Sequence, residues 1–160
     1  MELKYGSFET EYGHCWLLFD KCNLYLLQFF VDEVEAQHSI KKLFPSENFV
    51  EDNVLAERFG AELLRGEKSL KLSPQGSPFQ KLVWEALLQI PSGATVSYAD
   101  LAKSIGNPKA VRAVANAVAA NPIAILIPCH RIIRSDGQLG GYRWGLAMKK
   151  QLLIQEATKR

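Results

Sequence analysis

Cysteine is scarce in this sequence, and the few cysteines present form no recognisable framework. The 160 residues include Cys15, Cys22 and Cys129, and no two of them make a Cys-x-x-Cys pair. Three cysteines cannot all pair with one another, so the sequence predicts free thiols and a reducing, cytoplasmic location. Together with His14 and His38, Cys15 and Cys22 still match no zinc-binding spacing. We therefore expect no metal and no cofactor.

Long apolar runs and a secretory leader are also lacking. No stretch approaches the ~20 apolar residues that a membrane-spanning helix needs. The opening MELKYGSFETEYG does not run from basic to apolar residues as a signal sequence does. Because 48% of the residues are hydrophobic and 22% are charged, the composition is typical of a soluble globular protein that does not enter a membrane.

A strong net charge is missing as well, since the formal charge is +2, but this average conceals a split. Residues 1–70 hold 7 Lys and Arg against 13 Asp and Glu, which gives −6. Residues 71–160 hold 12 against 4, which gives +8. Such asymmetry favours contact between the C-terminal part and a polyanion. The alternative is that charge simply varies along a chain that folds as one unit.

The first third of the chain predicts β-structure followed by helices. Residues 14–20 and 23–30 are rich in aromatic and aliphatic side chains, and the residues between them suit a hairpin. Apolar spacing then predicts helices over 32–44 and 54–66. The stretch 66–78 contains glycine, serine and proline and is typical of a connector.

The remainder is predicted to be mainly helical. Ser77 and Pro78 form a good cap and first turn for a helix over 79–90. We expect an α/β (α+β) protein. A small N-terminal domain of sheet and helices, residues 1–72, precedes a mainly helical C-terminal domain, residues 73–160.

Two short helices in the second half predict a helix-turn-helix. Ser97 opens a capping box for a helix that ends at Ile105 and Gly106. Asn107 is the predicted cap of a second helix over 108–120, which the proline after Asn121 ends.

The second of these helices has two faces. Helical periodicity assigns one stripe to the core, namely Val111, Val114, Ala115 and Val118. The other stripe carries two cations, an amide and alanines small enough for close approach to a nucleic acid: Lys109, Arg112, Ala113, Asn116 and Ala120. A helix with a mildly basic solvent face is the alternative.

A thiol and an imidazole adjoin in ILIPCHRII, residues 125–133. A nucleophilic thiol needs a nearby base or positive field. Neighbouring residues point in different directions, so we expect Cys129 and His130 to communicate through a water. In the last helix, Glu156 falls on the inward side with Lys149, where a carboxylate needs a partner such as an imidazole. Nucleophile, base and orienting group would then be Cys129, His130 and Glu156. The alternative is a buried, inert cysteine and a frayed glutamate.

The segment IPCHRII is similar to the signature of the O6-alkylguanine-DNA alkyltransferases, the methylated-DNA–protein-cysteine methyltransferases. The segments VSYADLA, GNPKAVRAVANAVAANP and GYRWGLAMKKQLLIQE also resemble this family, in its order and at compatible spacing. The match is close over residues 79–157 and weak over 1–70. It implies an RNase H-like N-terminal domain and a winged helix-turn-helix in the C-terminal one.

The resemblance also implies roles for individual residues. Cys129 would accept the alkyl group irreversibly, so that each molecule acts once. His130 would take the thiol proton through a water, and Glu156 would orient His130. Asn121 would brace the active-site turn, and Tyr98 would donate its phenolic proton toward the guanine O6.

Further residues are implied in DNA and substrate binding. Arg112 would enter the base stack where the damaged nucleotide leaves, and Tyr142, Arg143 and Lys149 would border the base pocket. Most members have a small residue or serine near position 143, although GYRWG is a familiar bacterial form, so the resemblance implies the contact of Tyr142 more strongly than that of Arg143. The remaining expected contacts with DNA are Lys109, Ala110, Asn116 and Arg131. The implied partner is double-stranded DNA carrying O6-alkylguanine, met by a monomeric, stand-alone protein.

Three other functions stay open from the sequence. A non-catalytic binder of alkylated DNA would share the fold, although such proteins commonly replace the cysteine by tryptophan. A helix-turn-helix regulator would need no Cys129, His130 and Glu156 beside its DNA-reading helix. A thiol hydrolase would use the same three residues but would not need Arg112. The sequence also leaves open whether O4-alkylthymine is a second substrate, and how large an alkyl group fits.

Overall fold

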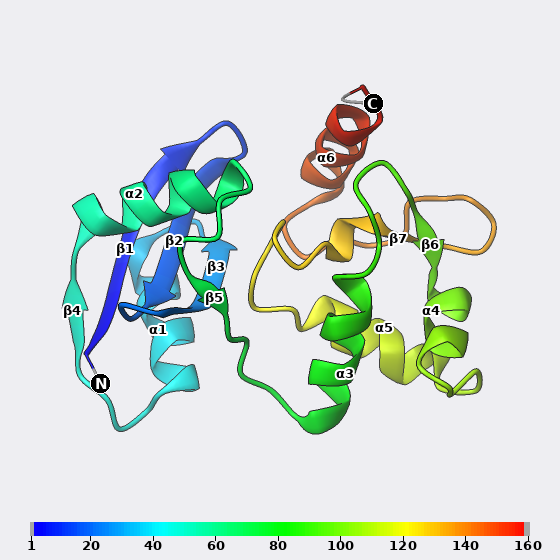
Figure 1. Cartoon of the computed structure of the whole chain (residues 1–160), viewed down its shortest axis with the longest axis horizontal. Coiled ribbons are helices and arrows are strands. Elements are labelled where there is room, and N and C mark those ends of the chain that lie inside the picture. The colour runs from blue at the N-terminus through cyan, green and yellow to red at the C-terminus, as the bar shows by residue number, and fades with distance from the viewer. Residues whose placement is uncertain (1, 159–160) are drawn as a thin grey trace. The chain divides into compact units, whose positions relative to one another are not determined.

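The apolar segments of the first third form the strands that the sequence predicts. The computed structural model describes residues 2–158, and in it β2 (Gly13–Phe19) and β3 (Asn23–Phe29) pair antiparallel. Three more strands complete a five-stranded sheet of order β4-β1-β2-β3-β5 (Figure 1). These are β1 (Leu3–Thr10), β4 (Phe49–Glu51) and β5 (Lys71–Leu72). None of these three strands was predicted, because two are very short and β1 lacks the continuous apolar character of its neighbours.

Two helices cover opposite faces of this sheet (Figure 1). Both were predicted, and they span α1 (Glu33–Leu43) and α2 (Asn53–Leu64), capped by Asp32 and Asp52. Successive strand residues point to opposite faces. Trp16 and Leu18 therefore join the core cluster that contains residues of α1, whereas the ring of Phe19 packs edge-on against Phe59 of α2.

The described residues fall into two compact units. The first holds the chain up to Gln75 together with Pro122–Leu126, and the second holds Gly76–Asn121 and the chain from Ile127 onward. The segment Pro122–Leu126 belongs to the first unit because it pairs with Leu27 of β3. The N–H of Leu27 donates to the carbonyl of Pro122 over 3.0 Å, and the N–H of Ala124 donates to the carbonyl of Leu27 over 2.7 Å. The expected domain division between residues 72 and 73, and the RNase H-like character of the first domain, stay predictions.

The second unit is mainly helical, as expected. Its helices are α3 (Pro78–Leu87), α4 (Tyr98–Ser104), α5 (Val111–Ala119) and α6 (Leu146–Thr158), with a 3-10 turn η1 at Cys129–Arg131. A two-stranded parallel sheet joins β6 (Val96–Ser97) to β7 (Ile132–Ile133). The chain is thus a mixed α/β protein with an N-terminal sheet and a helical C-terminal region. No helix within residues 2–158 is long and apolar enough to cross a membrane.

The predicted caps of α3 and α4 are confirmed. Ser77 and Gln80 form a reciprocal capping box at α3, and the Ser97 hydroxyl accepts from the backbone N–H of Asp100 in α4. The predicted start of α5 is wrong, because Asn107 accepts at its backbone oxygen from the N–H of Ala110 in a turn. The helix therefore begins at Val111, without a side-chain cap.

The two faces of α5 follow the predicted periodicity. Val114, Ala117 and Val118 are buried, whereas Arg112, Ala113 and Asn116 are exposed. The prediction omitted Ala117, whose carbonyl accepts a 2.8 Å hydrogen bond from the indole N–H of buried Trp84. Packing against α3 therefore holds α5 with its polar side chains in solvent.

Candidate active site

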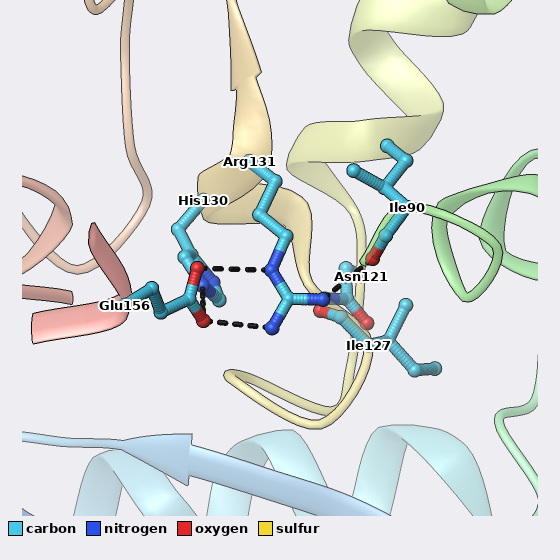
Figure 2. Close-up of polar contacts among 6 residues, drawn as sticks. All are labelled: Ile90, Asn121, Ile127, His130, Arg131 and Glu156. Atoms are coloured by element: carbon cyan, nitrogen blue, oxygen red, sulfur yellow. Dashed lines mark hydrogen bonds and ion pairs between the residues drawn. The ribbon is translucent and has the colours of Figure 1, made fainter. Parts of the chain in front are cut away.

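The thiol lies in a short, hydrogen-bonded turn. Cys129 begins η1, and its backbone N–H donates to the carbonyl of Ile127 over 2.8 Å. The amide nitrogen of Asn121 donates to the same carbonyl, also over 2.8 Å (Figure 2). Asn121 is 1% exposed and stands just after α5, so it ties the end of that helix to the turn that carries the thiol.

The Cys129 thiol is protonated at rest. Cys129 is 6% exposed, and this burial raises the pKa of its thiol. A hydrogen bond with the side chain of Asn121 and the positive charges of Lys149 and Arg143 act in the opposite direction but do not cancel it. A base is therefore needed before this sulfur can act as a nucleophile.

His130 is the candidate for that base. Its side chain is fully buried, and its Nε2 lies 2.9 Å from Oε2 of Glu156 on α6 (Figure 2). Its other ring nitrogen, Nδ1, has no hydrogen-bond partner within residues 2–158. An ionised carboxylate at Nε2 places the ring proton there. Nδ1 is then left with a free lone pair, which can accept a proton.

Arg131 is held by this same carboxylate. Its Nε and NH2 donate to Oε1 and Oε2 of Glu156 over 3.0 and 2.7 Å, and its NH1 donates to the carbonyl of Ile90 over 2.6 Å. The side chain of Arg131 is 15% exposed. These hydrogen bonds all go to partners inside the unit, and the expected contact of Arg131 with DNA stays a prediction.

Lys149 is likewise directed inward. It is 0% exposed, and its ammonium donates to the carbonyls of Ile132 over 2.6 Å, of Gly141 over 3.2 Å, and of Leu139. Burial lowers the pKa of Lys149 by more than the neighbouring Cys129 raises it, so this pKa lies below its ordinary value. All three N–H donors of the ammonium are in use. Lys149 thus holds the loop before α6 to β7 from within, and its expected place beside the base pocket stays a prediction.

Two phenols flank the thiol. Burial raises the pKa of Tyr98, at the start of α4, and Cys129 raises it further. Burial raises the pKa of Tyr142, and so does the negative charge that Cys129 carries once it becomes a thiolate. Both hydroxyls therefore keep their protons at neutral pH and can serve as donors.

A surface cavity of about 600 Å³ opens beside Tyr98. The loop before α6 lines the rest of it, including Leu139, Gly140 and Gly141. Gly140 has a φ of 73°, and a Cβ atom there would lie 3.7 Å from the Tyr98 hydroxyl. Residues with a side chain rarely adopt such a φ, so this turn beside the phenol favours glycine. Arg143 is exposed, with its NH1 3.5 Å from the carbonyl of Asn121 and its guanidinium over the ring of Trp144.

The predicted residues separate into two groups. One group comes together around η1 and consists of Cys129, His130, Glu156 and Asn121. The other group lies on the exposed face of α5 and in the turn before it, and consists of Arg112, Asn116, Lys109 and Ala110. Sequence reasoning missed the backbone carbonyls that hold the site, such as those of Ile90, Ile132 and Leu139. Every residue type carries a carbonyl, so no sequence signal marks them.

The pKa of Glu156 predicts a pH-dependent stability. Burial raises this pKa, but hydrogen bonds from His130 and Arg131 outweigh burial and lower it from 4.5 to about 2. The unfolded chain therefore takes up a proton at a higher pH than the folded one. We expect the free energy of unfolding to fall as the pH drops from 4.5 to about 2.

Urea denaturation at a series of pH values checks this expectation. The Glu156→Gln variant should show a shallower fall over this pH window, while the control Glu57→Gln, on the exposed side of α2, should follow the wild type. Parallel curves for wild type and Glu156→Gln would contradict the prediction.

Comparisons with known proteins match this chain to one family. The family model described as "6-O-methylguanine DNA methyltransferase, DNA binding domain" matches residues 78–158. A methylated-DNA–protein-cysteine methyltransferase of Methanosarcina acetivorans is 40% identical over 154 residues, covering 96% of this chain and 98% of that protein. The bifunctional transcriptional activator/DNA repair enzyme Ada of Escherichia coli is 38% identical over 163 residues, but this chain spans only 46% of its length.

Solved structures show the same similarity over both units. The crystal structure of Mycobacterium tuberculosis OGT in complex with DNA matches with a TM-score of 0.79 and 32% identity, covering 98% of this chain and 94% of that one. The O6-methylguanine-DNA methyltransferase of Pyrococcus kodakaraensis matches with a TM-score of 0.65 and 27% identity, covering 96% and 98%. By its sequence, its fold and the residues around its thiol, the chain belongs to the 6-O-methylguanine DNA methyltransferase family.

Proposed function

We propose that this protein repairs alkylated DNA directly, by transferring the alkyl group from O6 of guanine to its own Cys129. The observation that carries the proposal is the sequence of contacts around η1. A buried thiol adjoins a buried imidazole whose Nε2 is held by Glu156. Its Nδ1 has no hydrogen-bond partner in the described part of the chain and can accept a proton. The relatives named for this reaction support it.

The proposed reaction forms one bond and breaks one bond. His130 takes the thiol proton, through a water, and the sulfur attacks the alkyl carbon as the bond from that carbon to O6 breaks. The electron pair stays on the guanine oxygen, where a hydrogen bond from the Tyr98 hydroxyl stabilises the developing negative charge. The proton held by the His130 imidazolium then passes through water to the guanine, which restores both neutral guanine and neutral His130. The product on Cys129 is a thioether without a route back to the thiol, so each molecule acts once.

Access to the thiol requires the base to leave the duplex. Cys129 is 6% exposed, and an alkyl carbon inside stacked DNA cannot reach a buried sulfur. The nucleotide must therefore be extruded into the site. We propose that the cavity beside Tyr98 receives it, and that Lys109, Ala110 and Asn116 contact the DNA beside α5.

Arg112 is expected to be important for this extrusion. It is exposed on α5, and a side chain inserted into the stack compensates for part of the unstacking cost of a few kcal/mol. We predict that Arg112→Ala slows alkyl transfer from duplex DNA by about tenfold or more. A single-stranded substrate, which needs no extrusion from a duplex, should be repaired at close to the wild-type rate.

The control for this prediction is Arg65→Ala, at the exposed C-terminal end of α2, which should behave as the wild type on both substrates. Equal losses on duplex and single-stranded DNA would show that Arg112 acts in some other way than by replacing the extruded base.

The proposed partner is double-stranded DNA with O6-alkylguanine, bound by a monomer in the cytoplasm. O4-alkylthymine is a second substrate to be tested, because it offers the same alkyl–oxygen bond. Leu139 lines the cavity, and we expect it to influence the size of alkyl group that fits.

The intact mass of the protein tests the proposal. The protein is mixed with excess duplex DNA carrying a single O6-methylguanine, and its peptides are then mapped. We expect a gain equal to one methylene on Cys129 and no further turnover. Lesion-selective binding without a mass change would indicate a damage binder, and neither binding nor a mass change would reject the assignment.

A further inference from the structure

The guanidinium of Arg131 is placed as a clamp on Glu156. Two of its nitrogens donate to the two carboxylate oxygens of Glu156, at 3.0 and 2.7 Å, and the third donates to the carbonyl of Ile90 in the turn after α3 (Figure 2). Paired, parallel hydrogen bonds of this kind specify both the charge and the orientation of a carboxylate. The Ile90 carbonyl in turn fixes the orientation of the guanidinium.

The Glu156 carboxylate that Arg131 holds also hydrogen-bonds to His130. Oε2 of Glu156 accepts from Arg131 and lies 2.9 Å from Nε2 of His130. If Glu156 became a neutral acid, it could donate to Nε2, and the neutral ring would then carry its proton on Nδ1. An imidazole in that form cannot take a proton at Nδ1, the nitrogen that is otherwise free.

Other groups near the carboxylate do not replace the arginine. The ionisable groups that face Cys129, His130 and Glu156 are Tyr98 of α4, Tyr142 and Arg143 of the loop before α6, and Lys149 of α6. Both phenols are neutral donors near the thiol. The ammonium of Lys149 donates all its hydrogen bonds to backbone carbonyls. Arg131 is the cation that hydrogen-bonds directly to Glu156.

We propose that Arg131 is a positioning residue, which keeps Glu156 ionised and oriented so that Nδ1 of His130 stays free to receive the Cys129 proton. Arg131 thus acts through Glu156 rather than by contact with DNA. The effect on alkyl transfer rests on the proposed function, whereas the effect on Glu156 itself does not.

A double-mutant cycle on methyl transfer tests the proposal. We expect Arg131→Met to slow the single-turnover rate at saturating DNA by roughly 10–100-fold, as is typical when the partner of a catalytic group is removed. Affinity for the duplex should stay unchanged. In a Glu156→Gln background the same substitution should cost little further rate, because two residues that act through one contact are not additive. The rate of Arg131→Lys should lie between those of the wild type and Arg131→Met. Lysine keeps the positive charge but cannot form the two parallel hydrogen bonds of the guanidinium.

The matched control is Arg58→Met, an exposed arginine of α2, which should transfer methyl groups at the wild-type rate. Weakened DNA binding with an unchanged rate at saturation would make Arg131 a DNA contact and overturn the proposal. An equal loss of rate in the wild-type and Glu156→Gln backgrounds would also overturn it, because Arg131 would then act independently of Glu156.

A spectroscopic titration separates this proposal from the proposed function. Carbon-13 NMR of the labelled glutamate carboxyls follows Glu156 in the free protein and requires no alkyl transfer. The midpoint for Glu156 should rise in Arg131→Met and stay near its wild-type value of about 2 in Arg58→Met. If the titration midpoint of Glu156 is the same in Arg131→Met as in the wild type, the proposal that Arg131 keeps Glu156 ionised is overturned. A wild type that gains no methyl group, yet shows the shifted midpoint, would reject the proposed function and leave the clamp standing.

Discussion

The Cys129→Ala variant is expected to leave O6-methylguanine in duplex DNA unrepaired and to show no gain in mass. Alanine offers no lone pair to the alkyl carbon, and loss of a nucleophile from a catalytic unit lowers rates by about a thousandfold or more. Cys129→Ser should be as inactive within the assay. Its hydroxyl fits the same space, but it loses a proton far less readily than a thiol does.

The other thiols provide the control for this experiment. Cys22 is exposed, whereas Cys15 is buried in the sheet, where burial raises the pKa of its thiol. Cys22→Ser should accept one methyl group per molecule, as the wild type does. Lesion binding should persist in Cys129→Ala, which shows that the site still folds. A methyl group found on Cys22, or on any residue of the Cys129→Ala variant, would contradict the assignment of the acceptor.

The second large effect is expected at Lys149. Methionine in its place keeps a similar length but leaves the carbonyls of Ile132, Leu139 and Gly141 without their buried donor. Leaving a buried acceptor without its donor costs about 1–3 kcal/mol. We expect Lys149→Met to lower the free energy of unfolding by at least about this amount in urea denaturation.

Methyl transfer by Lys149→Met should also slow, because the loop that lines the cavity loses its tie to β7 and the thiol loses a nearby positive charge. Lys150→Met tests the same substitution one residue further along α6, where the side chain is exposed. It should change stability by less than about 0.5 kcal/mol, as surface substitutions usually do. Similar losses in both variants would mean that the contacts of Lys149 with the carbonyls are not what stabilises the unit.

Local patterns predicted much of the secondary structure. The hairpin of β2 and β3, both helices of the first unit and the caps of α3 and α4 followed from apolar spacing and from serine caps. The start of α5 did not, since Asn107 and Pro108 suit a helix start equally well when they lie in a turn that redirects the chain. Strands β4 and β5 are too short for any local pattern, and they exist because a neighbouring strand offers them a partner.

The hydrogen bonds of Arg131 and Lys149 could not be predicted from the sequence. A cation close to a reactive thiol in a DNA-repair sequence suggests contact with phosphate, and both residues were expected to bind DNA or substrate. In the structure they are buried or nearly so, and they donate to Glu156 and to backbone carbonyls. Whether a long basic side chain turns outward or inward depends on the acceptors that the fold brings near it, and these come from distant parts of the chain.

By itself, the sequence determined the candidate chemistry of this protein: a Cys–His pair, a glutamate on the inward side of the last helix, and a helix with an exposed arginine. Those conclusions follow from residue identity and helical periodicity, which are local properties. Only the tertiary structure decided which groups meet. Among residues 2–158 it joined Glu156 to residues 25 and 26 positions earlier, left Nδ1 of His130 without a hydrogen-bond partner, and used all three donors of the Lys149 ammonium. Hydrogen bonding depends on distance and direction in space, and these are set when the whole unit packs.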